Sequence, residues 1–413
     1  MNANRRFASG SATVPVAAAG VPPAAFGGEC FRPEAESGGR DARAPKRIVV
    51  EKEPVPAAEN PEASAPKIVE DLLRQAERVH ASDIHLHRDH NGAAVSFRLD
   101  GLMAPAGRLS ADIAERVFGR IKFLARLKTY QETMPQDGRI DKGDVQGLCD
   151  IRVATYPTVT GEKIVLRLFN PAAAKGVAEL DFPAEAVAEL HHFLRQPSGM
   201  MLLTGPAGSG KTTTIYACLR ALAEPGGRHI ITIEDPVEQI VPGVMQTEVS
   251  EARGLDFAKA ARHLLRQDPQ ALVIGEIRDE ETANIAVRAA LTGHLVISTL
   301  HAGSCQGVLE RLLVLCADRS AIAAAVELVL NQRLMRRLCR ECRGAGCAAC
   351  LQTGCQGRVP VVEWLQINDD LRTRIRSHQL QTVAPQRALE ESARLLLQQG
   401  VTNQSELRRI FGL

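Results

Sequence analysis

The chain has 413 residues, too many for a typical single core, so we expect two or three domains. Hydrophobic residues make up 45% of it and charged residues 24%, and its 50 Lys and Arg nearly balance 48 Asp and Glu. This balance does not suggest a nucleic-acid-binding protein, and the lack of an uninterrupted apolar run of about 18 residues excludes a membrane-spanning helix.

The first 64 residues are rich in Ala, Pro, Gly, Glu and Ser and show no hydrophobic periodicity. Such a composition buries too little apolar surface to offset the entropy of ordering, so we predict a disordered tail over 1–64. Its basic start is similar to that of a signal peptide. The apolar part is weak, however, and Pro15 and Pro22 interrupt it, so we expect no cleaved signal.

Residues 65–170 are predicted to form a small α+β domain. The stretch VEDLLRQAERVHASD has helical spacing, and DIHLH and AVSFRLDG alternate as strands do. A further helix is expected around residues 116–127, followed by the strands CDIRVATYP and KIVLRLF.

Residues 171–413 are predicted to form an α/β domain. The helical stretch AEAVAELHHFLRQ precedes a short buried strand, MMLLTG, and further apolar strands read HIITIED, ALVIGE and HLVIST. Helical stretches such as FAKAARHLLRQ and ETANIAVRAALT separate them. Apolar strands that alternate with helices indicate a parallel sheet covered on both faces.

The motif GPAGSGKT at residues 205–212 matches the P-loop pattern G-x-x-x-x-G-K-[ST] between a strand and a helix. Its glycines let backbone N–H groups turn toward a phosphate, and a helix beginning near Lys211 directs its positive end at the same anion. We expect Lys211 to contact the β- and γ-phosphates of ATP and the Thr212 hydroxyl to bind Mg²⁺. The residues predicted to bind the nucleotide are Gly205, Pro206, Ala207, Gly208, Ser209, Gly210, Lys211, Thr212 and Thr213.

Two acidic positions follow apolar strands, where ligands of parallel sheets bind. Glu234 ends ITIE, and Glu276 follows ALVIG. One carboxylate is needed to organise Mg²⁺ and another to activate water; either alone is as consistent with a helix cap. His294 and His301 flank another buried strand, from where an imidazole can donate a hydrogen bond to a γ-phosphate.

Cys339, Cys342, Cys347 and Cys350 form two C-x-x-C pairs within residues 336–358. This spacing supplies four thiolates to tetrahedral zinc, and a hairpin closed by glycines can bring the pairs together. Four thiolates leave no open position on the metal, so we expect a structural zinc site.

The motifs TGPAGSGKTTT, TIEDPVE and LRQDPQALVIGEIRDEETANIAVRAALTGHLVISTLHA, with the cysteine pairs, resemble the secretion ATPase superfamily over residues 68–413. The resemblance is to its type II secretion and type IV pilus assembly branch (GspE/PilB). ASDIHLH, FRLDG, QDGRI, DIRVATYP and GEKIVLRL are similar to the amino-terminal ATPase-associated domain of that branch.

The resemblance implies a RecA-like ATPase domain in which TIEDPVE is the Asp box and Glu234 activates water. Glu276 then belongs to an atypical Walker B motif that has Gly275 where many P-loop enzymes have a carboxylate. His294 and His301 become the His box. Arginines of the preceding domain complete the site in this family, and Arg139, Arg152 and Arg167 stand at the matching positions.

The resemblance further implies a cytoplasmic homohexamer that uses ATP, Mg²⁺ and Zn²⁺ and binds no nucleic acid directly. It would associate peripherally with the inner membrane through a platform protein and drive polymerisation of pilin-like subunits. The large amino-terminal docking domain of many relatives is missing, so docking is expected to use another surface, or the chain is a shortened accessory motor.

Two substitutions depart from the family pattern. Cys355 replaces a usual aromatic residue, which leaves open whether it affects the zinc site, and His87 stands where relatives often have an acid. Three alternatives remain. A pilus-retraction ATPase generally lacks the cysteine pairs, a nucleotide-binding scaffold would not need the retained acids, and a DNA-handling motor would need a more basic groove and more aromatic residues.

Overall fold

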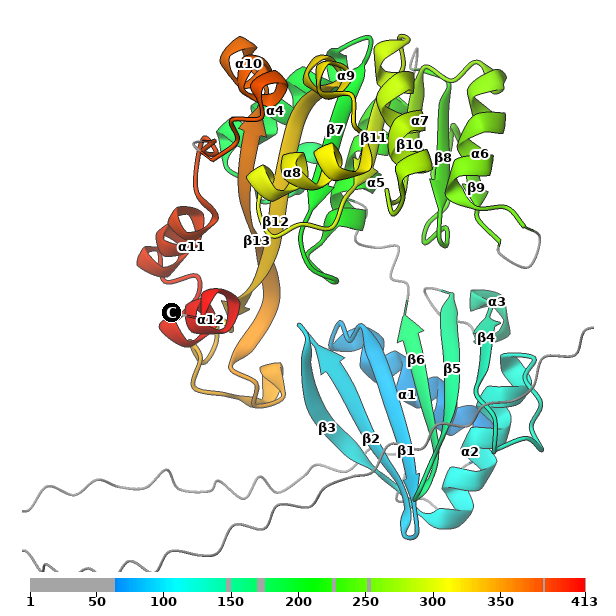
Figure 1. Ribbon diagram of the computed structural model, residues 1–413. Helices are drawn as coiled ribbons and strands as arrows, with labels where there is room; N and C mark the ends of the chain where they lie inside the picture. The colour runs from blue at the N-terminus through cyan, green and yellow to red at the C-terminus, as the bar shows by residue number, and fades with distance from the viewer. Residues whose placement is uncertain are drawn as a thin grey trace, which may run out of the picture. The chain divides into compact units, whose positions relative to one another are not determined.

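The computed structural model of the chain describes residues 64–145, 150–168, 175–224, 228–250, 254–381 and 383–412. All but one residue of the predicted tail, 1–64, lies outside this range. The described residues form two separate sheets with their helices (Figure 1). In these residues no helix has the length and apolar character needed to cross a bilayer.

The first sheet has six antiparallel strands in the order β3-β2-β1-β6-β5-β4. Its strands are β1 (Asp83–Asp89), β2 (Gly92–Leu99), β3 (Leu102–Leu109), β4 (Gln136–Ile140), β5 (Ile151–Thr158) and β6 (Gly161–Leu168). Helices α1 (Ala65–Arg78) and α2 (Ala111–Leu124) share its buried core, and α3 (Lys142–Val145) is a single turn. Alternate residues of β5 are exposed, as expected of a sheet with one face free of helices.

The second sheet has seven strands in the order β13-β12-β7-β11-β10-β8-β9. They are β7 (Gly199–Thr204), β8 (Ile230–Glu234), β9 (Val244–Glu248), β10 (Ala271–Ile274), β11 (Leu295–Thr299), β12 (Val326–Leu338) and β13 (Cys355–Gln366). Every neighbouring pair is parallel except β12 and β13. The sheet is therefore mixed, and the prediction of a parallel sheet holds for all strands but the last.

Helices cover both faces of this sheet, as predicted (Figure 1). One face packs against α4 (Ala184–Arg195) and α5 (Lys211–Leu222). The other packs against α6 (Phe257–Leu264), α7 (Glu280–Leu291), α8 (Cys305–Leu315), α9 (Arg319–Ala325) and α10 (Asp369–Ser377). Alternate residues of one strand enter opposite cores: Met200 and Leu202 of β7 face one, Met201 and Leu203 the other. This explains why the strand is apolar from Met200 to Leu203.

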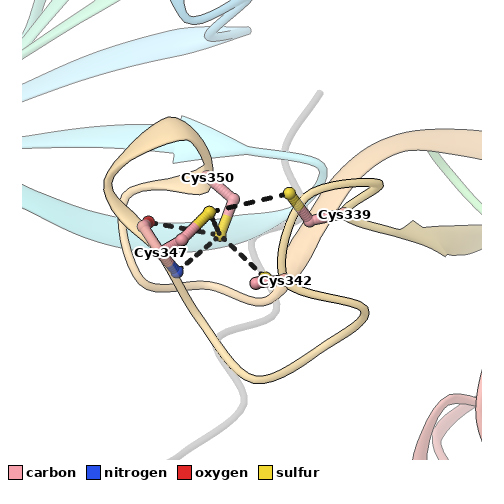
Figure 2. A group of neighbouring side chains, drawn as sticks. All are labelled: Cys339, Cys342, Cys347 and Cys350. Atoms are coloured by element: carbon pink, nitrogen blue, oxygen red, sulfur yellow. Dashed lines mark hydrogen bonds between the residues drawn. The ribbon is translucent and has the colours of Figure 1, made fainter.

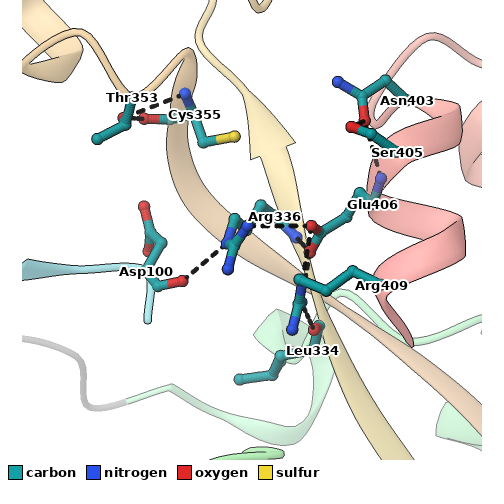
Figure 3. Close-up of polar contacts among 9 residues, drawn as sticks. All are labelled: Asp100, Leu334, Arg336, Thr353, Cys355, Asn403, Ser405, Glu406 and Arg409. Carbon is teal, nitrogen blue, oxygen red and sulfur yellow. Dashed lines mark hydrogen bonds and ion pairs between the residues drawn. The ribbon is translucent and has the colours of Figure 1, made fainter. Parts of the chain in front are cut away.

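The long hairpin β12–β13 carries the cysteine loop at its tip. Helices α11 (Leu389–Gln398) and α12 (Gln404–Phe411) pack against its outer part through a small core that includes Met335, Val361 and Leu407. The buried carboxylate of Glu406 accepts hydrogen bonds from the backbone N–H of Arg336 (2.8 Å) and from Nε of Arg409 (2.8 Å; Figure 3). These contacts fasten α12 to β12.

Candidate active site

The P-loop connects the fully buried strand β7 to helix α5, which begins at Lys211 as predicted. Gly205 has a φ of +136°, and a Cβ there would lie 2.2 Å from the carbonyl oxygen of Gln332. Gly210 has a φ of +92° and caps α5. Both positions therefore require glycine, and the loop presents the amino-terminal end of α5 to a ligand.

The side chains of the loop suit an anion. Nζ of Lys211 donates to the carbonyl oxygens of Gly205 (2.8 Å) and Pro206 (3.0 Å), so the ammonium lies across the loop. Burial lowers the pKa of Lys211, and the nearby charge of Glu276 opposes this effect. The buried Oγ of Ser209 has no partner among the described residues, while Thr212 is exposed at the start of α5. The loop thus offers a cation, an unsatisfied hydroxyl and a helix end for phosphate oxygens.

The strand order brings the two predicted acids together. Strands β8 and β10 are parallel neighbours, so Glu234 at the end of one and Glu276 just after the other lie at the same edge of the sheet. Both line one pocket of about 140 Å³ with Lys211 and Thr212. A P-loop lysine, a threonine hydroxyl and two carboxylates in one pocket can hold a magnesium nucleotide and activate water.

Glu234 accepts three hydrogen bonds. Tyr216 Oη donates to its Oε2 (2.5 Å), and Thr232 Oγ1 (2.5 Å) and Gln246 Nε2 (3.0 Å) donate to its Oε1. None of these three donors is predicted from the sequence. Their relation to Glu234 depends on contacts between α5, β8 and β9, which no local motif reveals.

The carboxylate of Glu276 lies between the guanidinium group of Arg278 and the imidazole ring of His301. Nε of Arg278 lies 2.8 Å from one of its carboxylate oxygens, and Nε2 of His301 lies 3.1 Å from the other. A Cβ at Gly275 would lie 3.0 Å from the carbonyl oxygen of Ile233, which is tighter than ordinary van der Waals contact. The close packing of Gly275 against β8 leaves little room for the carboxylate that many P-loop enzymes carry there.

The two predicted histidines lie at opposite ends of β11. His301 follows the strand beside Glu276, whereas His294 precedes it, with Nδ1 3.0 Å from the carbonyl oxygen of Ala289. A five-residue strand is about 17 Å long. His301 therefore lies beside Glu276, which lines the pocket with Lys211, whereas His294 lies at the far end of β11. That both histidines contact the γ-phosphate stays a prediction.

The three predicted arginines form a row across the first sheet. In the strand register Arg139 of β4 is opposite Arg152 of β5, which is opposite Arg167 of β6. Residues directly opposite in an antiparallel pair project from the same face, and all three side chains are exposed. Asp83 lies 3.0 Å from Nε of Arg167, and Asp150 lies 2.6 Å from Nη2 of Arg139. The row is a cationic surface suited to phosphate oxygens.

The four predicted cysteines converge at the tip of the hairpin (Figure 2). All their sulfur atoms lie within 4.8 Å of one another, and Cys339–Cys347, Cys342–Cys350 and Cys347–Cys350 are 3.8, 3.8 and 3.7 Å apart. Four sulfur ligands at about 2.3 Å from a tetrahedral zinc ion are separated by about 3.8 Å. The thiols therefore fit a Cys₄ zinc ion.

Backbone N–H groups support the ligands as thiolates. Gly346 donates to Sγ of Cys342 (3.2 Å), and Cys347 and Gly354 donate to Sγ of Cys350 (3.3 Å each). Burial raises the pKa of Cys350, but these two donors and the neighbouring thiols of Cys347 and Cys342 together lower it to about 7. A hydrogen bond from the backbone of Cys350 lowers the pKa of Cys347, but burial and the thiols beside it raise that pKa on balance to about 12. Cys355, the fifth thiol, is not a member of the cluster found among the described residues.

Comparisons with known proteins agree with this geometry. A family model described as "Type II/IV secretion system protein" matches residues 58–409. The type II secretion system protein HxcR of Pseudomonas aeruginosa is 39% identical over 364 residues, which cover 83% of this chain and 76% of HxcR. The type IV pilus assembly ATPase PilB of Thermus thermophilus is 37% identical over 339 residues, which cover 75% of this chain and 38% of PilB. Among solved structures, the pilus retraction motor PilT with bound ADP matches with a TM-score of 0.60 at 27% identity, covering 83% of this chain and 96% of PilT.

Proposed function

Because the chain belongs to the type II/IV secretion system protein family, whose relatives include secretion and pilus assembly ATPases, we propose that it is a P-loop ATPase that powers polymerisation of pilin-like subunits. ATP, Mg²⁺ and a structural Zn²⁺ are the ligands that this family and the cysteine cluster imply. The observation that carries the proposal is the placement of Lys211, Thr212, Glu234 and Glu276 in one pocket.

Each of these side chains has a role in the proposed hydrolysis. Lys211 and the N–H groups at the start of α5 hold the phosphates, and the Thr212 hydroxyl binds the metal ion, with Glu276 beside it. Bound Mg²⁺ would neutralise phosphate charge. Glu234 accepts the proton of the attacking water, and His301, which contacts Glu276, responds to the loss of the γ-phosphate.

Assembly rather than retraction is the proposed direction of the motor. HxcR is a type II secretion system protein and PilB is a type IV pilus assembly ATPase, and they are 39% and 37% identical to the chain. The two cysteine pairs also favour the assembly branch, because pilus-retraction ATPases generally lack them. We further propose a homohexamer on the cytoplasmic face of the inner membrane, attached through a membrane platform protein, with Arg139, Arg152 and Arg167 completing the ATP site.

Replacement of the proposed base tests this function. The purified wild-type chain is expected to release phosphate from ATP in the presence of Mg²⁺. Glu234→Gln is expected to bind ATP but to hydrolyse it at least about a hundredfold more slowly, because the amide cannot accept a proton. Absence of hydrolysis by the wild type would favour the scaffold alternative, and equal hydrolysis by both proteins would refute the assignment of Glu234.

A further inference from the structure

Tyr216 joins the P-loop helix to the proposed base. It lies in α5, five residues after Lys211, and only 4% of its surface is exposed. Its hydroxyl donates to Oε2 of Glu234 (2.5 Å) and accepts from the backbone N–H groups of Glu238 and Gln239 (3.1 Å each). Burial raises the pKa of Tyr216, so the phenol keeps its proton at neutral pH. The two N–H donors occupy its acceptor positions and direct that proton to Glu234.

Gln246 approaches the other carboxylate oxygen in a defined orientation. Its Oε1 accepts from the backbone N–H of Val241 (2.7 Å), and its Nε2 donates both to the carbonyl oxygen of Gln239 (2.9 Å) and to Oε1 of Glu234 (3.0 Å). A flipped amide would oppose a donor to a donor and an acceptor to two acceptors. The backbone partners therefore fix Nε2 as the group that faces Glu234.

Thr232 supplies the third donor from the strand that carries Glu234. This residue is fully buried, and its Oγ1 donates to Oε1 of Glu234 (2.5 Å). A carboxylate has about four acceptor positions, of which these three donors occupy three. About one position is left for a water molecule.

We infer that Tyr216, Thr232 and Gln246 are positioning residues that hold the carboxylate of Glu234 in one orientation toward the attacking water; this rests on the proposed function, in which Glu234 is the base. The three donors come from α5, β8 and β9. Because α5 also holds the phosphates at its amino-terminal end, the hydroxyl of Tyr216 fixes the base relative to the bound nucleotide. A displacement of about 1 Å between a base and its substrate is sufficient to cost about a hundredfold in rate.

The competing explanation is that Tyr216 only fastens the segment 236–241 to α5, since its hydroxyl also bonds that backbone. Loss of a purely structural contact would lower nucleotide affinity and turnover together, or neither. Loss of a positioning contact lowers the rate of the chemical step and leaves nucleotide affinity unchanged. Single-turnover hydrolysis and the affinity for a non-hydrolysable ATP analogue therefore separate the two explanations.

The test uses the whole chain of 413 residues and substitutions at two independent positions. Tyr216→Phe and Thr232→Val each remove one hydroxyl and keep the side-chain size, while Thr232→Ser keeps the hydroxyl. We expect the first two to lower single-turnover hydrolysis at least about tenfold with analogue affinity within about twofold of wild type. Thr232→Ser and Tyr130→Phe, a control at a residue that is 82% exposed, should hydrolyse ATP within about twofold of wild type.

The outcomes are distinguishable. Near-normal hydrolysis by Tyr216→Phe and Thr232→Val, or a parallel loss of affinity and rate, overturns the inference while the proposed function stands, provided that Glu234→Gln is inactive. If Glu234→Gln hydrolyses ATP as the wild type does, both the base and its positioning residues are refuted.

Discussion

Glu406 shows how one buried carboxylate attaches the last helix. Its side chain lies 3.3 Å from Nη1 of Arg336 and 2.8 Å from Nε of Arg409, and Asn403 caps the same helix by accepting from the N–H of Glu406 (3.0 Å; Figure 3). Burial by itself raises the pKa of Glu406. The hydrogen bonds from Arg409 and from the backbone of Arg336 outweigh burial, and the net pKa is lowered from its ordinary value of 4.5.

A carboxyl group whose pKa is lower in the folded state stabilises the fold above its ordinary pKa, and this contribution is lost as the pH falls toward the folded value. We therefore expect Glu406→Gln to lower the free energy of unfolding by about 2 kcal/mol at pH 7, discounted for the partly exposed Arg409. The deficit should shrink below about pH 4.5. Urea unfolding at both pH values measures it.

The control for this prediction is Glu390→Gln. Glu390 lies 3.7 Å from Arg394 in an exposed pair on α11, and such pairs contribute less than about 1 kcal/mol. A deficit of Glu406→Gln that is equal at acid and neutral pH would show that packing, not the charge of Glu406, attaches α12.

At the scale of elements, a strand is easiest to predict from the sequence when both of its faces are buried along its whole length. Strands β7, β10 and β11 are buried on both faces, so their continuous apolar runs identify them. The strand β12 does not show such a run, because its outer part is only partly buried at Arg333, at Leu334 and from Arg336 to Leu338. β3 contains Pro105 and Gly107, which weaken its strand pattern.

Residues of the candidate site can likewise be predicted from the sequence only where their position relative to a strand is informative. Glu234 and Glu276 are predictable because residues that follow parallel strands meet at one edge of the sheet. His294 precedes its strand, and a motif that brackets a strand does not distinguish its two ends. The sequence patterns around Tyr216 and Gln246 predict which residues are buried but not which side chains they contact. Their hydrogen bonds with Glu234 are therefore known only from the structure.

Five cysteines lie within one short segment at the hairpin tip, and their spacing alone does not decide which four of them bind zinc. We expect one zinc ion per chain in the wild type and in Cys355→Ser, because Cys355 is outside the cluster of four sulfur atoms. Cys350→Ser should lose the metal, because a neutral hydroxyl is a far weaker zinc ligand than a thiolate. Metal analysis of the purified proteins measures this, and loss of zinc from Cys355→Ser would contradict the assignment.

At the scale of the whole molecule, the proposed ATP site draws on two folded parts. The P-loop and both acids lie on the second sheet, and the arginine row lies on the first. Asp150 and Asp83 already pair with the outer arginines of the row, Arg139 and Arg167. A phosphate bound at the row would be a further anionic partner for these guanidinium groups.

Substitution of Arg152, at the centre of the row, tests whether residues of both sheets contribute to the ATP site. Arg152→Ala should bind ATP nearly as well as the wild type, because the P-loop is intact, but hydrolyse it at least about a hundredfold more slowly. Arg152→Lys should not restore the rate, since an ammonium lacks the planar fork that grips two phosphate oxygens. Arg108→Ala, at an arginine of β3 paired with Asp89, is the control and should retain activity. Normal hydrolysis by Arg152→Ala would confine the ATP site to the second sheet, whereas loss of turnover with retained binding would make hydrolysis depend on both parts of the molecule.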